Sequence, residues 1–348
     1  MKYRLLGETG LYVSELCLGT MTYGSAGFWQ VMGGLGQEAV TTQVKYAFEQ
    51  GVNFIDTANV YSFGQSEQLV GQAIKELGLP RDELVLATKA TGIMDELPNG
   101  RGQSRYHLMN EVEASLKRLQ LDHIDLYLLH GFDPLTSLEE ALGTLNDLVR
   151  SGKVRYIGLC NMAAWQIMKG LGISEHRGWA RFAAAQAYYS IAGRDLEREV
   201  LPLLCDQGLG LMVWSPLAGG LLTGKFAPDG KGPEGSRRSK FDFPVVDKER
   251  AFRCLDVMRP IAERHGVSVS KIALAWLLAQ REVSTVIVGA RTIEQLQDNL
   301  GAGEVTLSGE ELQDLEQVSR LPEEYPGWML ERQGQYRSEP PIRGNSSG

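Results

Sequence analysis

The sequence lacks any hydrophobic run of the ~18 apolar residues that a membrane-spanning helix needs. Its first ten residues, Met-Lys-Tyr-Arg-Leu-Leu-Gly-Glu-Thr-Gly, are interrupted by charge and glycine before an apolar secretory segment can form. We therefore expect a cytoplasmic protein with no membrane partner.

Cysteine and excess positive charge are also scarce. The four cysteines, Cys17, Cys160, Cys205 and Cys254, are far apart, form no Cys-x-x-Cys pair and have no histidine at ligand spacing. This pattern predicts reduced thiols, no disulfide and no bound metal. With 35 Lys and Arg against 43 Asp and Glu, a net charge of −8, and no long basic run, the chain has no phosphate-attracting surface that would indicate a nucleic-acid partner.

What the sequence does contain is an alternation of short apolar runs with amphipathic stretches. The apolar runs predict eight strands, near residues 16–19, 53–56, 84–88, 125–129, 154–159, 183–187, 210–214 and 285–288. The amphipathic stretches predict helices, near residues 38–50, 105–120, 137–149, 195–207 and 268–280. Crossover helices between successive strands require a parallel sheet. Eight such units favour closure into an α/β (β/α)8 TIM barrel, with active residues at the C-terminal ends of the strands.

Two segments fall outside this repeat. Residues 226–246 are rich in glycine, proline and charge and predict a long loop, which leads into an extra amphipathic helix at 247–265. After the eighth strand come a helix near 308–319 and a tail, 320–348, whose last residues, 343–348, we expect to be mobile. No linker divides the chain, so we expect residues 1–348 to form a single domain.

Three of the predicted strands end in Asp56, Lys89 and His130, and Tyr61 follows the first of them. A free phenol has a pKa of ~10, so Tyr61 is a poor acid unless a cation stabilises its phenolate, and Lys89 is the cation at that rim. Asp56 would hold the lysine, and a neutral His130 would orient a carbonyl group. Each residue alone is weak evidence, but their joint placement indicates proton transfer to a carbonyl oxygen without a metal.

Six ordered blocks accompany Lys89: residues 51–61 (GVNFIDTANVY), 64–67 (GQSE), 125–130 (DLYLLH), 152–158 (GKVRYIG), 214–219 (WSPLAG) and 289–291 (GAR). In this order they resemble the aldo-keto reductase superfamily over nearly the whole chain. They are more similar to the members that act on varied aldehydes and ketones, including the potassium-channel β-subunits, than to the aldose-reductase branch. The resemblance implies a (β/α)8 barrel that binds NADP(H) in extended form, with Asp56, Tyr61, Lys89 and His130 as catalytic residues.

The resemblance also implies a row of residues that bind NADPH or NADP+. Those expected near the nicotinamide and its ribose are Gly19, Thr20, Met21, Asp56, Cys160, Asn161, Gln186 and Trp214. Those expected around the pyrophosphate are Ser215, Pro216, Leu217, Ala218, Gly219, Lys225 and Arg237. Those expected at the adenosine are Gly289, Arg291, Gln295 and Asn299.

Physical roles follow for several of these residues. The amides of Asn161 and Gln186 suit the carboxamide, which presents one donor and one acceptor group, and Trp214 would stack on the nicotinamide. Arg291 is the natural partner of a 2′-phosphate. Cys160 stands where the family usually has serine, and a thiol is the weaker hydrogen-bonding group.

Substrate contacts are expected from a set of mainly aromatic residues that could line an apolar cleft. They are Phe28, Trp29, Tyr61, His130 and Phe132, with Met32, Tyr189, Trp328 and Met329 as further candidates. Such a mouth favours hydrophobic or cyclic carbonyl compounds. The sequence leaves open whether the chain is a monomer or a homo-oligomer.

Two nucleotide motifs compete with this interpretation. Residues 34–39 (GLGQEA) match a dinucleotide fingerprint, but the preceding strand ends some fifteen residues earlier. Residues 219–225 (GGLLTGK) resemble a phosphate loop, yet Phe226 stands where a hydroxyl should meet Mg²⁺. A different class of function also stays open, a subunit that senses NADP(H) with little turnover while docked to a partner. The intact set of four residues favours reversible reduction of aldehydes and ketones.

Overall fold

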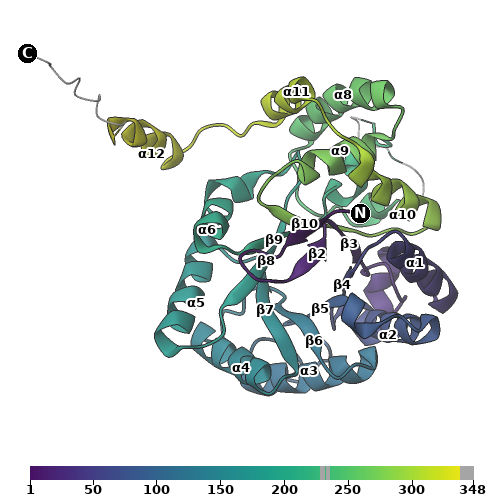
Figure 1. The fold of residues 1–348 in the computed structure, drawn as a ribbon, viewed down its shortest axis with the longest axis vertical. Coiled ribbons are helices and arrows are strands. Elements are labelled where there is room, and N and C mark those ends of the chain that lie inside the picture. Colours follow the sequence, from purple (N-terminus) through teal and green to yellow (C-terminus); the bar gives the residue numbers. More distant parts are fainter. Residues whose placement is uncertain (228–231, 233–235, 338–348) are drawn as a thin grey trace, which may run out of the picture.

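The centre of the computed structural model is a closed barrel of eight parallel strands, in the order β10-β3-β4-β5-β6-β7-β8-β9 (Figure 1). The structure describes residues 1–227, 232 and 236–337. The barrel strands are β3 (Leu16–Gly19), β4 (Phe54–Asp56), β5 (Val85–Ala90), β6 (Ile124–Leu129), β7 (Val154–Cys160), β8 (Phe182–Tyr188), β9 (Gly210–Trp214) and β10 (Val283–Val288). All eight predicted strands are therefore confirmed, and so is the TIM-barrel fold class.

Helices surround the barrel (Figure 1). They are α1 (Gln37–Glu49), α2 (Gln65–Leu77), α3 (Arg105–Leu119), α4 (Leu138–Arg150), α5 (Ala164–Arg177), α6 (Val200–Gln207), α7 (Arg237–Lys240), α8 (Lys248–His265), α9 (Val269–Leu278), α10 (Ile293–Leu300), α11 (Gly309–Ser319) and α12 (Gly327–Gly334). Short 3-10 turns join them: η1 (Gly27–Val31), η2 (Tyr61–Gly64), η3 (Arg81–Glu83), η4 (Asp195–Arg198), η5 (Ala218–Thr223), η6 (Gly301–Glu304) and η7 (Gln335–Arg337).

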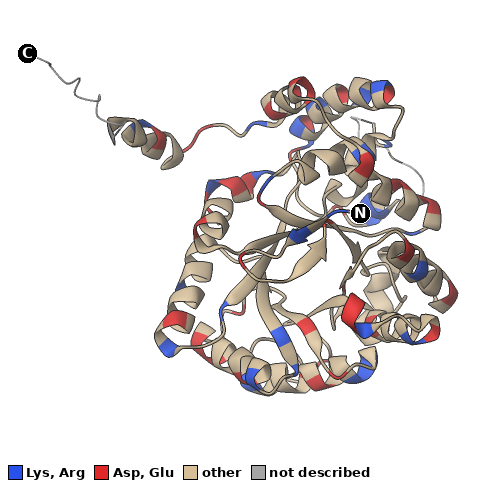
Figure 2. Cartoon of the chain, in the orientation of Figure 1, with Lys and Arg blue, Asp and Glu red and all other residues tan. Residues whose placement is uncertain are grey.

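Most predicted helices are present, including the extra helix α8 and the late helix α11. The predicted helix at 195–207 is broken into η4 and α6 by the non-helical backbone of Glu199 (φ −136°). The predicted loop at 226–246 contains the short helix α7, and the pattern did not reveal α2, α5, α10 and α12. Both charge signs are interspersed along the outer helices (Figure 2), and no helix among the described residues is long and apolar enough to span a membrane.

An antiparallel hairpin of β1 (Tyr3–Leu5) and β2 (Tyr12–Ser14) lies across the N-terminal end of the barrel (Figure 1). Its strands are too short for a period-2 pattern to reveal them. Leu6 and Val13 are fully buried in the cluster that fills the barrel interior. The backbone approach is so close that a Cβ on Gly7 would lie 2.5 Å from the carbonyl oxygen of Gly208. The hairpin therefore seals this end.

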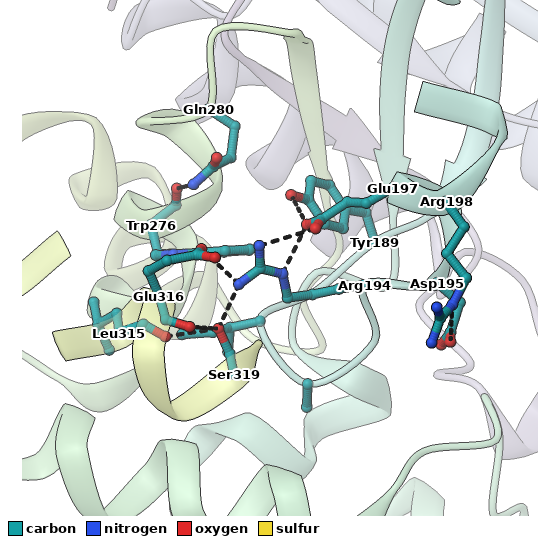
Figure 3. A network of polar contacts seen from close by, with 12 residues as sticks. Tyr189, Arg194, Asp195, Glu197, Arg198, Trp276, Gln280, Leu315, Glu316 and Ser319 are labelled. Atoms are coloured by element: carbon teal, nitrogen blue, oxygen red, sulfur yellow. Dashed lines mark hydrogen bonds and ion pairs between the residues drawn. The ribbon is translucent and has the colours of Figure 1, made fainter. Parts of the chain in front are cut away.

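The C-terminal part divides into an anchored and a separate segment. Helix α11 is fixed by the buried guanidinium of Arg194, which bonds Glu316 at 2.6 Å and Ser319 at 2.8 Å (Figure 3). Helix α12 lies apart from the barrel in Figure 1 and has no buried residue. The prediction that residues 343–348 are mobile concerns residues outside those that the structure describes.

Candidate active site

Strand parity brings the predicted catalytic residues to one rim of the barrel. Side chains alternate between the two faces of a strand, so residues two apart point the same way. In β5, Val85 and Ala87 fill the barrel interior, and Lys89 follows in the same direction. By the same count, Asp56 at the end of β4 and His130 just after β6 follow interior residues. These three side chains form the uppermost layer of the stack inside the barrel.

Lys89 is the centre of this layer and is fully buried. Its Nζ donates to Asp56 Oδ2 at 2.7 Å, to the carbonyl oxygen of Thr57 at 2.8 Å and to Tyr61 Oη at 3.3 Å. The three donors of the ammonium thus meet a carboxylate, a carbonyl and a phenol. The phenol is the one partner of the three that carries an O–H group while it is bonded to the ammonium.

The electrostatics of the layer define its resting protonation state. Burial raises the pKa of Tyr61, and the charge of Lys89 lowers it only in part, so the net pKa is raised. Burial lowers the pKa of Lys89, but Asp56 and Tyr61 outweigh that effect and raise it. Burial, and then the charge of Lys89, lowers the pKa of His130 to about 3. At neutral pH the layer therefore holds an ammonium, a protonated phenol and a neutral imidazole.

The loop that carries Tyr61 has an uncommon backbone. Ser62 and Phe63 have left-handed φ values of 49° and 52°. Such values are unfavourable for non-glycine residues and persist where the surroundings impose them, often at functional sites. The buried hydroxyl of Ser62 donates to the carbonyl oxygen of Tyr23 at 3.2 Å. This bond helps to hold the turn that places the phenol beside Lys89.

Aromatic side chains surround the phenol. The ring of His130 meets Tyr61 edge-on with centroids 5.7 Å apart, and Trp29 is tilted toward Tyr61 at 5.3 Å. Phe28 contacts Trp29 at 6.2 Å. Four of the five predicted substrate residues are thus brought together. Phe132, 46% exposed, makes no ring contact with them within the described part of the chain.

The row of rings continues through residues that the sequence did not single out. Phe241 meets Phe28 edge-on at 5.1 Å and stacks on Phe243 at 5.4 Å. Phe243 stacks on Trp214 at 5.7 Å, with ring planes only 10° apart. The signal for these residues in the sequence was a pair of phenylalanines two positions apart, directly after the basic stretch 237–240. The loop before α8 therefore reaches the loop after β3 across the rim.

Two amide side chains lie near the C-terminal ends of the neighbouring strands β7 and β8: Asn161 directly follows β7, and Gln186 lies within β8, two residues before its end. The exposed Asn161 accepts a hydrogen bond at Oδ1 from Trp214 Nε1 at 2.9 Å, and the buried Gln186 donates from Nε2 to Asp56 Oδ1 at 2.9 Å. Asn161 itself has a left-handed φ of 53°. Cys160 is fully buried in the barrel interior, so its thiol reaches no ligand space without movement.

A cationic cluster lies beyond the aromatic row. Arg237 is half-buried, and burial, then the charges of Arg238 and Arg291, lower its pKa to about 10. Its Nε and the hydroxyl of Ser236 are buried and have no hydrogen-bond partner among the described residues. Unpaired buried donors beside like charges are costly unless an anion satisfies them. Lys225, also predicted here, is exposed.

The predicted pyrophosphate loop is the irregular segment around η5. Ser215 and Ala218 have left-handed φ values of 52° and 50°. Ser215 Oγ accepts a hydrogen bond from the backbone N–H of Gly219 at 3.0 Å, and Arg238 Nη1 donates to the carbonyl oxygen of Ala218 at 2.6 Å. Pro216 is buried and Leu217 half-buried. The arginine therefore fixes the loop at Ala218.

The predicted adenosine residues gather at the end of β10. The backbone N–H of Arg291 donates to Gln295 Oε1 at 2.9 Å, and Asn299 Nδ2 donates to the carbonyl oxygen of Gly289 at 3.4 Å. The Arg291 guanidinium also bonds backbone carbonyl oxygens of the segment after β3, such as that of Val31 at 2.8 Å. The arginine is thus already a bridge between two loops.

The predicted ribose residues lie where β3 meets β4 and β10. Gly19 pairs with Asp56, and a Cβ on Gly19 would lie 2.6 Å from Cγ2 of Ile287. Thr20 is buried and donates to the Asp56 carbonyl oxygen at 3.1 Å, whereas Met21 is half-buried. The glycine is therefore required for strand packing and leaves the rim without a side chain at this point.

Three further candidates for the cleft are wrong. The phenol of Tyr189 is bonded to Glu197 at 2.6 Å and its ring packs on Trp276, in the layer outside the barrel. Trp328 and Met329 belong to α12, which lies apart from the barrel (Figure 1). These two residues were chosen for their apolar side chains, and residue type does not show where a C-terminal helix lies relative to the barrel.

Neither competing nucleotide motif has its required context. Gly34 and Gly36 follow irregular chain, since β3 ends at Gly19 and α1 begins at Gln37. Residues 219–225 lie largely within η5 and follow no strand directly. Among the described residues, no group of three or more His, Cys, Asp or Glu side chains could hold a metal ion. The phenol of Tyr61, the imidazole of His130 and the cationic cluster around Arg237 give the rim the groups needed to donate a proton, orient a carbonyl group and bind an extended anion.

Comparison with known proteins agrees with this geometry. The chain matches the Aldo/keto reductase family over residues 15–320. It is 36% identical to a putative aryl-alcohol dehydrogenase of Schizosaccharomyces pombe, over 90% of this chain and 95% of that protein. It is 36% identical to a norsolorinic acid reductase of Emericella nidulans, over 96% of this chain and 86% of that protein. A putative voltage-gated potassium channel subunit beta of S. pombe is 39% identical, over 87% of this chain and 88% of that protein.

Proposed function

The chain belongs to the aldo/keto reductase family, and from this premise we propose that it reduces aldehydes and ketones reversibly with NADPH, using Tyr61 as the proton donor. The observation that carries the proposal is the contact of 3.3 Å between Tyr61 Oη and the fully buried Nζ of Lys89. An oxidoreductase role agrees with the relatives named above.

In the proposed reaction the protein handles the proton. Tyr61 gives its proton to the carbonyl oxygen, and the phenolate that remains is stabilised by Lys89 at the same 3.3 Å contact. Asp56 keeps the ammonium in place, and the neutral His130 orients the carbonyl through its ring N–H. Burial holds the pKa of Tyr61 above its ordinary value, so the phenol carries its proton at neutral pH before a carbonyl compound binds.

The residues present fit NADPH, whose nicotinamide would supply the hydride when bound. The unpaired Nε of Arg237 and hydroxyl of Ser236 suit a pyrophosphate, and Arg291 suits the 2′-phosphate. Gln295 and Asn299 flank Arg291, and the exposed Asn161 and buried Gln186 suit the carboxamide. The aromatic row ending at Trp214 offers a flat surface for the nicotinamide.

The substrate class follows from the rings around Tyr61. Trp29 and Phe28 extend from the phenol, so the group attached to the carbonyl would meet flat apolar surfaces. The names of the relatives that act on aryl alcohols and norsolorinic acid support the same choice. We propose aromatic or cyclic aldehydes and ketones.

The test is oxidation of NADPH, followed by absorbance, with a panel of aromatic, cyclic and small aliphatic carbonyl compounds. The Tyr61→Phe variant should keep its fold and bind NADPH but lose turnover by ~10²-fold or more. Tyr23→Phe is the matched control, because Tyr23 is also buried but its hydroxyl bonds Gln43 at 3.1 Å. If Tyr61→Phe retains most of the activity, the proposed proton donor is wrong.

A second function has support from the potassium-channel relative. In that role the protein binds NADP(H) and senses its redox state with little turnover. The wild-type protein would then bind NADPH but oxidise it with none of the carbonyl compounds in the panel.

A further inference from the structure

The outer face of β5 carries a buried carboxylate directly behind Lys89. Thr88 and Lys89 are consecutive in β5, so their side chains point to opposite faces of the strand. The Lys89 side chain lies inside the barrel, whereas the Thr88 hydroxyl donates to Oε1 of Glu67 on α2 at 2.6 Å. Thr88 and Glu67 are both fully buried. A carboxylate in such a place requires a cationic partner.

Arg118 of α3 is that partner, and it binds two carboxylates at once. Its Nε donates to Glu67 Oε2 at 2.5 Å, and its Nη2 donates to Glu111 Oε2 at 3.2 Å. The side chains of Arg118 and Glu111 are mostly buried, so salt and solvent weaken these contacts little. Because the donors of a guanidinium form a rigid fork, this one arginine fixes the two carboxylates relative to each other.

The two carboxylates connect Arg118 to both ends of the segment 59–67, which carries Tyr61 and is called here the Tyr61 turn. Glu67 is its last residue. At its first residue, Asn59 Nδ2 donates to Glu111 Oε2 at 2.9 Å. The turn is therefore held at both ends by one guanidinium.

The arginine also supports the middle of the Tyr61 turn. A Cβ on Gly64 would lie 2.6 Å from Cδ of Arg118, so the backbone of the turn rests directly on the arginine stem. Between these contacts Ser62 and Phe63 keep their left-handed backbone. Such a backbone persists only where its surroundings impose it. Release of either end would let the turn relax and displace the phenol of Tyr61.

We propose that Arg118 is a positioning residue for Tyr61, because it holds both ends of the turn and so keeps the phenol 3.3 Å from Nζ of Lys89. Arg118 lies on the outer side of β5 and acts through the turn alone. This inference rests on the proposed function, in which Tyr61 is the proton donor, and extends it to a residue outside the barrel. Lys89 stabilises the phenolate only at close range, so a displaced phenol is a weaker acid and the reaction slows.

The test compares Arg118→Met with Arg105→Met, which removes an arginine of the same helix from an exposed pair with Asp147. Arg118→Met should lower the single-turnover rate of NADPH oxidation with an aromatic aldehyde roughly 10- to 100-fold, because the phenol is misplaced. Its affinity for NADPH, measured by isothermal titration calorimetry, should equal that of the wild type. Arg105→Met should match the wild type in both measurements.

Two further measurements separate positioning from a general loss of structure. In the Tyr61→Phe background, Arg118→Met should lower the remaining rate by less than about twofold, because the group that it positions is gone. In the pH profile of alcohol oxidation, the alkaline limb of Arg118→Met should move upward by roughly one pH unit, because the phenol loses part of the effect of Lys89.

Asn59→Ala tests the same inference with a smaller disturbance, and it decides the question if Arg118→Met does not fold. It removes one arm and leaves the ion pair of Arg118 with Glu67 intact. The single-turnover rate should fall roughly three- to tenfold, and only when Tyr61 is present.

The outcomes distinguish this inference from the proposed function. If the folded variants of Arg118 and Asn59 keep the wild-type rate, or lose the same factor with and without Tyr61, Arg118 does not position the phenol. The proposed function then stands. If Tyr61→Phe alone keeps most of the activity, Tyr61 is not the proton donor and both proposals are overturned.

Discussion

Two cations, Lys89 inside the barrel and Arg194 outside it, are both buried but have different kinds of hydrogen-bond partner. The Arg194 guanidinium makes a two-point contact with Glu197 (2.7 and 2.9 Å), and further bonds to Glu316 and Ser319 hold it against the ring of Trp276 (Figure 3). Every one of its partners is fixed within the fold. Lys89 bonds one carboxylate and one carbonyl, but its third partner, Tyr61, can ionise.

The two cations differ in whether one of their hydrogen-bond partners can change its charge when a ligand binds. A guanidinium stays charged in proteins and is matched here by two carboxylates, so the Arg194 cluster can only hold α11 and the loop after β8 together. An ammonium with a titratable phenol as neighbour can lower the free energy of a phenolate when one forms. Burial alone therefore does not distinguish the two cations; the chemistry of their partners does.

The largest effect should come from removing the cation inside the barrel. Lys89→Met removes the charge that stabilises the phenolate, and alcohol oxidation, in which Tyr61 acts as the base, should fall roughly 10²- to 10³-fold. The measurement is NADP+ reduction with an aromatic alcohol from about pH 7 to pH 11, a range that brackets the ordinary phenol pKa. An alkaline limb identical in variant and wild type would contradict the pairing.

Removing the cation outside the barrel should affect stability and not chemistry. Arg194→Met leaves Glu197 without its cationic partner, and we expect a loss of about 2–3 kcal/mol in the free energy of unfolding, below the usual range for buried pairs because Glu316 is 51% exposed. Urea unfolding measures this loss, with Arg259→Met, which breaks an exposed pair with Asp256, as the control. Turnover of the folded variant should stay close to wild type; a loss comparable to that of Lys89→Met would mean that the two clusters are coupled.

A third cation, Arg291, should affect the choice of cofactor. It is proposed to bind the 2′-phosphate, so NADPH should be preferred over NADH by one to two orders of magnitude, about 1.4–2.7 kcal/mol. Arg291→Ala should remove most of that preference by weakening NADPH alone. Calorimetric titration with both cofactors measures it. Equal losses for both would indicate that the bonds of Arg291 to the segment after β3 matter more than the phosphate.

The smallest effect concerns pH and His130. Because the pKa of His130 is lowered to about 3 in the folded protein, the unfolded chain binds the extra proton first as pH falls below its ordinary value of about 6.5. The stability contributed by the neutral imidazole is therefore present above about pH 6.5 and is lost progressively toward pH 3. His130→Asn should give a flatter curve of unfolding free energy against pH, by less than about 1.4 kcal/mol per pH unit because the side chain is half-buried. His176→Asn, at an exposed position, should follow the wild-type slope.

Much of the barrel was predictable because its strands are apolar runs between amphipathic stretches. The bounds of all eight strands agree with the prediction to within two residues. Helices α2 and α5 were missed although they are regular, and the hairpin β1–β2 was missed because three residues carry no periodicity. Tertiary contacts, such as the close approach of Gly7 to Gly208, create the hairpin.

The placement of Asp56, Lys89 and His130 in one layer was predictable from position, since strand ends meet at one rim, and parity would have added the direction of each side chain. The hydrogen bonds of Asn161 with Trp214 and of Gln186 with Asp56 were not, because the sequence does not show which side chains meet at the rim. Phe241 and Phe243 were missed because the irregular segment between α7 and α8 has no periodic pattern that places its rings. The candidates Tyr189, Trp328 and Met329 were wrong because sequence shows residue type and not the side of the barrel on which a residue lies.

The hairpin β1–β2 covers the N-terminal end of the barrel, so within the described part of the chain the interior is approached from the rim at the C-terminal ends of the strands. Leu6 and Val13 form the base of this interior, and within the described residues Lys89 has no exposed surface of its own. Tyr61, which is 8% exposed, is the hydrogen-bond partner that lies between Lys89 and the rim. In the proposed reaction a bound substrate would cover Tyr61. The phenolate formed in each turnover would therefore regain a proton from solvent only after the alcohol has left.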